Sequence, residues 1–184
     1  MIRKQDVFPG ENVHVLQCGD TSAAKRKLDE GFATQPTDIV LHTGTNDIET
    51  VDACTVAEQI MTNAAEAAEG YGCNVVVSTL PPRSDQPNDM NVEEANKRIN
   101  QLKQTNIRYS RIKVVNHNSL TVEHLYDRKH LSSFRKHGVS GCQVLAGDFY
   151  WAVYGKELQE TRYNSVIKQR PSFRQRMHSG PHYR

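Results

Sequence analysis

The feature that most constrains the fold is a regular alternation of short apolar strands with longer amphipathic helices. Four segments have the apolar, β-branched pattern of strands, over residues 12–17, 38–43, 74–79 and 112–117. Helical periodicity separates and follows them, over residues 23–28, 55–69, 91–104 and 140–154. Strands that alternate with helices in this way imply right-handed crossovers and a parallel sheet. The sequence therefore predicts a three-layer α/β/α fold with a flavodoxin-like parallel sheet of about four strands.

The charge of the chain is unevenly distributed along its 184 residues. Residues 156–184 hold seven Lys or Arg and two Asp or Glu, a net charge of +5, whereas residues 1–155 have a net charge of −3. We therefore expect one domain over residues 1–155 and a basic, disordered tail over residues 156–184. The mildly acidic body argues against a dedicated nucleic-acid-binding domain, so weak contact with nucleic acid or an anionic surface is expected only from the tail.

Targeting and metal-binding signals are weak in this sequence. We see no apolar run long enough to cross a membrane and no secretory signal after Met1, so we expect an intracellular, cytoplasmic protein. None of the four cysteines lies in a C-x-x-C motif, which favours reduced thiols over a metal or redox site: Cys18, Cys54, Cys73 and Cys142. The H-x3-H spacing of His178 and His182 has no acidic or cysteine partner nearby. We therefore expect no metal and no cofactor.

The first candidate site follows the second predicted strand, in Gly44-Thr45-Asn46-Asp47. Sites of parallel sheets form in the loops beyond the carboxyl ends of the strands. Gly44 lets the backbone approach a ligand closely, and the side-chain amide of Asn46 is placed to donate to a developing oxyanion. A tight turn with an Asx hydrogen bond would account for the same residues.

The second candidate site is the D-x-x-H sequence formed by Asp127 and His130. In a loop, this spacing brings a carboxylate beside an imidazole, and the carboxylate then fixes the tautomer of the histidine as a general base. A polar surface loop is the alternative interpretation, because His117, His124 and His137 also lie in this region. The two loops together, at one edge of one parallel sheet, indicate a site more strongly than either loop alone.

With these motifs in this order, the chain resembles the SGNH (GDSL-like) hydrolases over about residues 7–155. Residues 38–47 resemble the third sequence block of that superfamily, and residues 126–131 resemble the fifth, D-x-x-H-L. The chain is similar in particular to the esterase-like domains of animal retroelement-derived proteins. The resemblance implies a serine esterase in which His130 is the base, Asp127 orients it, and Asn46, with Gly19 and Gly44, contributes to the oxyanion hole.

The sequence departs from this family where the nucleophile belongs. The family places its serine after a first strand and ahead of the glycine that corresponds to Gly19, and no such strand and serine precede Gly19 here. Gly19-Asp20-Thr21-Ser22 imitates the nucleophile block, with Ser22 or Thr21 as the attacking residue, but Ser22 as a helix N-cap explains it more simply. We therefore expect a domain that lacks its first strand and its serine, and that is weakly active or inactive as given.

Three functions are consistent with the sequence. The first is an incomplete SGNH-type serine esterase that acts on an ester of unknown identity. The second is a non-catalytic module of a retroelement-derived protein, which binds RNA, lipid or protein partly through its basic tail. The third is a flavodoxin-like protein with a phosphate or nucleotide site, for which the sequence offers no glycine-rich phosphate loop.

Overall fold

The computed structural model describes residues 12–85, 90–132 and 140–155. The predicted tail over residues 156–184 and the pair His178 and His182 lie outside the described residues. The helices are α2 (Thr21–Glu30), α3 (Ala53–Tyr71), α4 (Met90–Thr105) and α5 (Gly141–Tyr154), and the strands are β1 (Asp38–Leu41), β2 (Asn74–Ser78) and β3 (Ile112–Val115). Three short 3₁₀ helices lie between them: η1 (Asp47–Glu49), η2 (Ile107–Tyr109) and η3 (Val122–His124).

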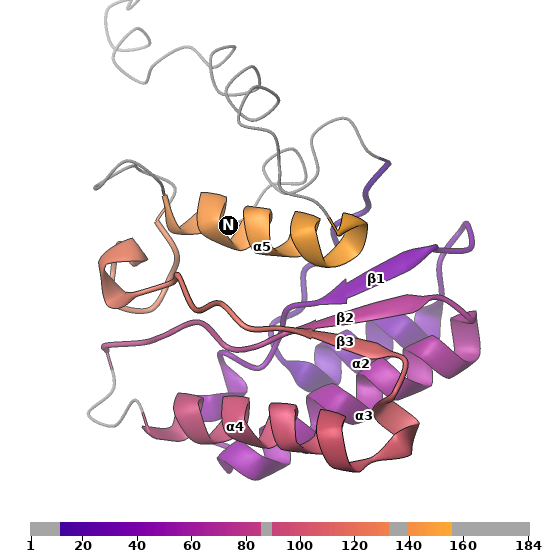
Figure 1. Cartoon of the computed structure of the whole chain (residues 1–184), viewed down its shortest axis with the longest axis horizontal. Helices are drawn as coiled ribbons and strands as arrows, with labels where there is room; N and C mark the ends of the chain where they lie inside the picture. The colour runs from indigo at the N-terminus through magenta and orange to yellow at the C-terminus, as the bar shows by residue number, and fades with distance from the viewer. Residues whose placement is uncertain (1–11, 86–89, 133–139, 156–184) are drawn as a thin grey trace, which may run out of the picture.

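The strands form one parallel sheet in the order β1-β2-β3. Ile39 pairs with Val75, and Val76 pairs with Lys113, so the three strands point the same way and end at the same edge. Helix α5 covers one face of the sheet, and α2, α3 and α4 lie on the other (Figure 1). The predicted mixed α/β class and three-layer architecture are therefore confirmed.

The predicted strand over residues 12–17 is wrong, and the described sheet has three strands instead of about four. Residues 12–18 have no regular secondary structure, and Val15 and Leu16 are each 47% exposed. Alternating β-branched residues indicate only that a segment suits a sheet, and a strand also needs a neighbour to share its backbone hydrogen bonds. Within the described residues, β1 pairs with β2 alone, so this segment does not pair with β1.

The ends of the helices follow from local capping residues. Helix α2 is capped by the side chain of Asp20, which accepts a hydrogen bond of 2.6 Å from the backbone of Ala23, so the predicted N-cap role of Ser22 is wrong. Asp20 competes better because it directly precedes the helix, whereas Ser22 lies within its first turn. Ser140, at which the predicted last helix begins, caps α5 in a capping box with Gln143.

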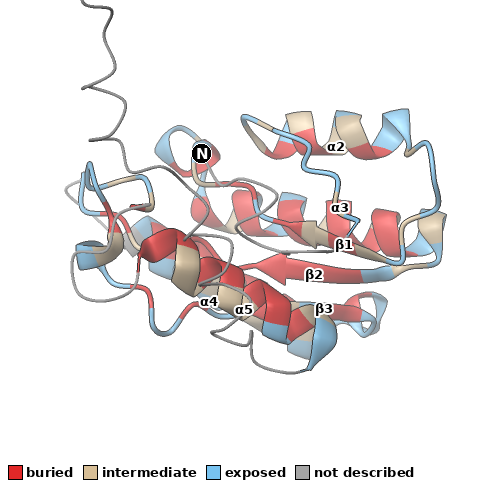
Figure 2. Cartoon of the chain, turned by 90° about the horizontal axis from the view of Figure 1, so that it is seen from above, coloured by how far each residue is buried: buried red, intermediate tan, exposed pale blue. Residues whose placement is uncertain are grey.

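Two apolar clusters hold the layers together, one on each face of the sheet. The larger cluster lies between the sheet, α3 and α4, and its fully buried members include Ile60, Met61 and Ile99. The smaller cluster lies between the sheet and α5, with Leu145 at its centre. Burying each side chain of this size contributes about 1.5–3 kcal/mol. Figure 2 shows the buried residues concentrated on the strands and on the inner sides of the helices.

The described part of the chain shows no candidate for a membrane-spanning helix. None of the helices there combines the length with the apolar character needed to pass through a bilayer.

Candidate active site at the carboxyl edge of the sheet

The Asp127–His130 pair forms as the sequence predicts, within a short loop. Oδ2 of Asp127 lies 2.6 Å from Nδ1 of His130, and Oδ1 accepts hydrogen bonds from the backbone N–H groups of Lys129 and His130. The N–H of Tyr126 donates to the carbonyl of His130, which closes the loop. Arg128 adopts φ 69°, the left-handed conformation that turns both N–H groups toward the carboxylate. The loop is therefore built around the charge of Asp127.

The ionised carboxylate of Asp127 determines which nitrogen of a neutral His130 ring carries the hydrogen. The backbone N–H of His130 is the first cause that lowers the pKa of Asp127 far below its ordinary value, and the imidazole of His130 adds to it. With Asp127 ionised, Nδ1 of neutral His130 carries the hydrogen, so Nε2 is left to accept a proton. The His130 side chain is 58% exposed and stacks on the ring of Tyr126, so Nε2 is accessible to a small molecule.

The structure also brings Asn46 and Gly19 together. Nδ2 of Asn46 donates a hydrogen bond of 2.7 Å to the carbonyl oxygen of Gly19, although the two residues are 27 positions apart in sequence. The Asn46 amide carries two hydrogens, and this bond uses one of them. Both residues are exposed, so the second hydrogen of Asn46 and the N–H of Gly19 belong to an open part of the edge.

Gly44 has a packing role that differs from the predicted one. It adopts φ +103°, and a Cβ atom built on it would lie 2.8 Å from Ile60 and 3.1 Å from Val56, both on α3. The close backbone approach expected here is therefore an approach to helix α3, because the turn after β1 must pass directly over its apolar side chains.

Thr21 and Ser22, the two nucleophile candidates within the chain, occupy different environments. The Thr21 hydroxyl is buried, 3.0 Å from Oδ1 of Asp47 and 2.8 Å from Oε1 of Gln59, and its backbone N–H donates to Asp47. These contacts attach the start of α2 to the Asn46 loop. Ser22 lies exposed in the first turn of α2.

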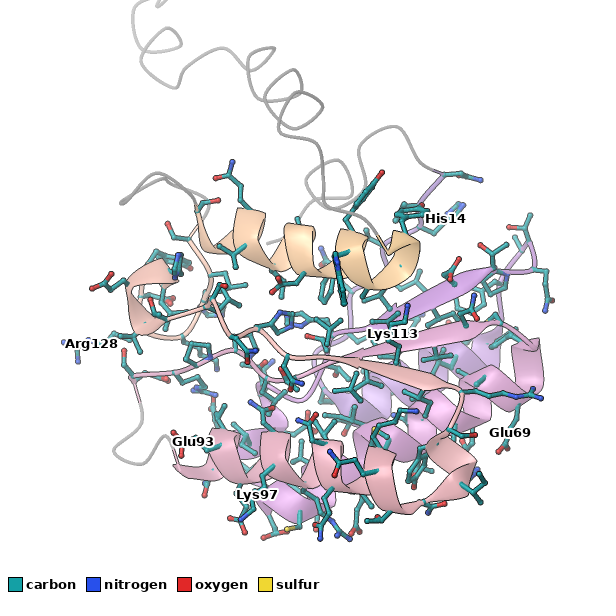
Figure 3. All side chains as sticks on the ribbon, in the orientation of Figure 1. His14, Glu69, Glu93, Lys97, Lys113 and Arg128 are labelled. Atoms are coloured by element: carbon teal, nitrogen blue, oxygen red, sulfur yellow. The ribbon has the colours of Figure 1, made fainter. Side chains whose placement is uncertain are left out.

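Arg83 connects the Asn46 loop to the His130 loop, and we did not predict this role from the sequence. Its side chain is 1% exposed and donates to the carbonyl of Thr45 at 2.6 Å, to Glu49 at 2.9 Å and to Asp85. Glu49 also binds Lys129, next to His130, and the N–H of Ser84 donates to the carbonyl of Arg128. Its position in Pro81-Pro82-Arg83, at the end of β2, was the available signal. Figure 3 shows Arg128 pointing away from the body of the protein beyond this network.

A second polar cluster lies at the same edge and was also not predicted; we call it the Ser78 array. Oγ of Ser78 lies 2.7 Å from Nε2 of His117 and 2.8 Å from Nδ1 of His42, and Nδ1 of His117 lies 2.7 Å from Oδ2 of Asp148. The array runs from the end of β1 through β2 and the end of β3 to α5. Polar residues at the carboxyl ends of three successive strands were the signal for it.

The Ser78 array predicts a pH dependence of stability. Packing around the His42 ring, followed by the nearby His117, lowers the pKa of His42 from 6.5 to about 4, although part of the residue reaches solvent. Between these values the unfolded chain binds more protons at this position than the folded chain. The free energy of unfolding should therefore fall as the pH decreases from 6.5 to about 4. Urea denaturation at intervals across this range measures the effect.

The His42→Gln variant tests the origin of that slope. Its side-chain amide still donates to Ser78 but does not titrate, so its free energy of unfolding should depend less on pH over the same range. Three carboxylates make the free energy of unfolding depend on pH below this range, because their pKa values are lowered from ordinary carboxylate values: Glu49, Asp85 and Asp127. An equal slope in the variant and in the unmodified protein would contradict this origin.

Neither a metal site in the described residues nor a related protein family identifies the function of this edge. Among the described residues, no group of three or more His, Cys, Asp or Glu side chains has a geometry that could hold a metal ion. Comparison of the sequence with models of known protein families and with curated proteins finds no match.

Proposed function

We propose that the loops at the carboxyl edge of the sheet form the base and oxyanion half of an esterase site of the SGNH type. The observation that carries this proposal is the 2.6 Å contact between Asp127 and His130 at the edge that also holds Asn46 and Gly19. The family resemblance of residues 38–47 and 126–131 supports it. The substrate would be an acyl ester.

Each residue would contribute one part of acyl transfer. His130 takes a proton at Nε2 from the attacking oxygen, and Asp127 holds its ring and stabilises the imidazolium that results. Asn46 donates its second amide hydrogen, and Gly19 its N–H, to the oxygen that becomes negative. The nucleophilic serine would come from a strand–serine block outside residues 12–155. Thr21 is unsuited to this role because Asp47 and Gln59 already engage its buried hydroxyl.

Hydrolysis of p-nitrophenyl acetate tests the role of His130. Without the serine block, a site of this type retains only the slow catalysis supplied by its oxyanion donors and base, about 10³–10⁴-fold over water. We expect slow hydrolysis by the chain of 184 residues. In His130→Ala the rate should fall close to that of the uncatalysed reaction in buffer. Because any exposed imidazole attacks this ester to some degree, His14→Ala is the matched control; its side chain lies beside the end of α5 (Figure 3).

The outcome separates the esterase from its alternative. A rate that falls in His130→Ala but not in His14→Ala supports the esterase site. Equal rates in all three proteins would contradict it and favour the non-catalytic module, which binds a partner without transforming it.

The source of the nucleophile needs a separate experiment. Translation of the reading frame upstream of Met1 should show an apolar strand ending in Gly-Asp-Ser within about fifty residues, in keeping with the spacing of βα units. A chain extended by this segment should hydrolyse the same ester at least about 10³-fold faster, because base and nucleophile act as a unit. A stop codon with no such strand would leave the proposal without its nucleophile.

A further inference from the structure

We propose that Ser78 is a reactive serine that accepts acyl or phosphonyl groups from small electrophiles, with His117 as its base and Asp148 as the group that orients His117. The contacts Ser78–His117 and His117–Asp148, both 2.7 Å, reproduce the order serine, histidine, aspartate in a hydrogen-bonded line. The array shares no residue with the Asp127–His130 site. It therefore goes beyond the proposed esterase function and does not depend on it.

The hydrogen bonds of the Ser78 array fix the tautomer of a neutral His117 ring. The Asp148 carboxylate can only accept, so Nδ1 of His117 carries a hydrogen and Nε2 of the neutral ring is an acceptor. The single hydrogen of the Ser78 hydroxyl can point to Nε2 of His117 or to the carbonyl oxygen of Thr79, 2.9 Å from Oγ, and Nδ1–H of His42 donates to Oγ. The orientation toward His117 is the reactive one. In that orientation Ser78 is poised to transfer its proton to His117, as a serine nucleophile must be.

Burial protects the array, and His42 controls the way in. Ser78 is 1% exposed, and the His117 ring packs edge-on against Phe149 with ring centroids 5.6 Å apart. His42 makes a similar contact with Phe149 but belongs to the exposed residues of the edge. Rotation of the His42 side chain away from Ser78 would free one lone pair of Oγ and open a path for a small molecule. We therefore expect access to be slow and limited by His42.

The backbone around Ser78 offers no free N–H at Thr79 or Leu80 that would speed the breakdown of an adduct. The N–H of Thr79 donates to the carbonyl of Val115, and the N–H of Leu80 donates to the side chain of Asn96 at 2.7 Å. Neither is available to stabilise the oxyanion of a second, hydrolytic step. The inference is therefore a stoichiometric modification of Ser78, without turnover.

A fluorophosphonate reagent is the appropriate probe. Oγ of Ser78 attacks phosphorus, the O–P bond forms, the P–F bond breaks, and fluoride leaves. The hydroxyl proton moves to Nε2 of His117, which becomes an imidazolium beside Asp148 and later releases the proton to solvent. No oxidant, reductant or metal is needed for this step.

The experiment treats the folded chain of 184 residues with an ethyl alkylfluorophosphonate, follows the intact mass, and maps the modified peptide. We expect one phosphonyl group per chain, located on Ser78. The exposed serines Ser22 and Ser119 are internal controls, because reaction at either would follow exposure and not the array. Mapping in the unmodified protein keeps the test valid even where a variant fails to fold.

Two variants test the mechanism. Asp148→Asn removes the charge that fixes the His117 tautomer, and its partly exposed position favours folding; we expect labelling at least about 10-fold slower. His42→Ala opens the path and should speed labelling several-fold. Labelling of Ser78 that is unchanged in Asp148→Asn would overturn the assignment of roles. Absence of label on Ser78 in both the unmodified protein and His42→Ala, with circular dichroism showing a folded chain, would overturn the proposal and leave the array a purely structural link.

Discussion

Replacing Arg83 with methionine should lower the free energy of unfolding by about 3 kcal/mol, the low end for removing one partner of a buried ion pair. The methionine fills the space of the aliphatic part but removes the donor of Asp85 and of the carbonyl of Thr45, and it leaves Glu49 with Lys129 alone. We place the cost at the low end because both carboxylates retain some contact with water. Urea denaturation near pH 7 measures it.

Arg108→Met is the matched control for this loss. Arg108 also pairs with a glutamate, Glu69 at 3.2 Å, but both side chains are exposed. Surface pairs of this kind contribute about 0–1 kcal/mol. If the two variants lose similar free energy, Arg83 does not hold the Asn46 and His130 loops together. A larger loss in Arg83→Met supports its role as the residue that positions both loops.

Replacing Gly44 with alanine should destabilise the protein by about 2–4 kcal/mol, because two costs add. Alanine at this position would have to adopt φ +103°, a backbone conformation that costs an L residue about 1–3 kcal/mol of strain. The added Cβ also lies 2.8 Å from Ile60 and 3.2 Å from Leu80, and overpacking of a core adds about 1–3 kcal/mol. The flexible end of Ile60 can yield somewhat, so the sum falls short of both maxima.

Gly70→Ala separates this effect from any general cost of replacing glycine. Gly70 lies in helix α3, and a Cβ built on it meets no atom within 4 Å. Alanine is the better helix former, so this variant should be more stable by about 0.5–1 kcal/mol. If the conformation of Gly44 causes the destabilisation, the melting temperature should fall in Gly44→Ala and rise in Gly70→Ala. Two shifts of the same sign would contradict the expectation.

Periodic, local signals predicted most of the fold. Helices α3, α4 and α5 lie within two residues of the predicted ranges, because an apolar stripe and a cap such as Ser140 are written into consecutive residues. The segment over residues 12–17 has an equally good local pattern and still forms no strand, since pairing depends on what lies beside it. Local preference is thus sufficient for a helix but not for a strand.

The candidate site shows the same division between near and distant residues. The contact between Asp127 and His130 was predictable because three positions separate them and one turn joins them. Arg83 reaches Glu49 across 34 positions, and His117 reaches Asp148 across 31. No spacing rule connects such pairs, because only the completed sheet brings the loops after its strands to one edge.

The position of α5 has a consequence for how the molecule opens. Helix α3 is held by β2 and by helices on both sides, α2 and α4, whereas α5 packs mainly on β2 and β3. It is also tied by Asp148 in the Ser78 array, by a hydrogen bond from Lys113 to the carbonyl of Ala152 (Figure 3), and by a hydrogen bond from the N–H of Cys142 to the carbonyl of Ser132. Helix α5 therefore forms the natural boundary of a separate cooperative unit, able to detach while the opposite layer stays folded. A partial opening of this kind would bare the apolar face of β2 and β3 to the surroundings before the rest of the chain unfolds.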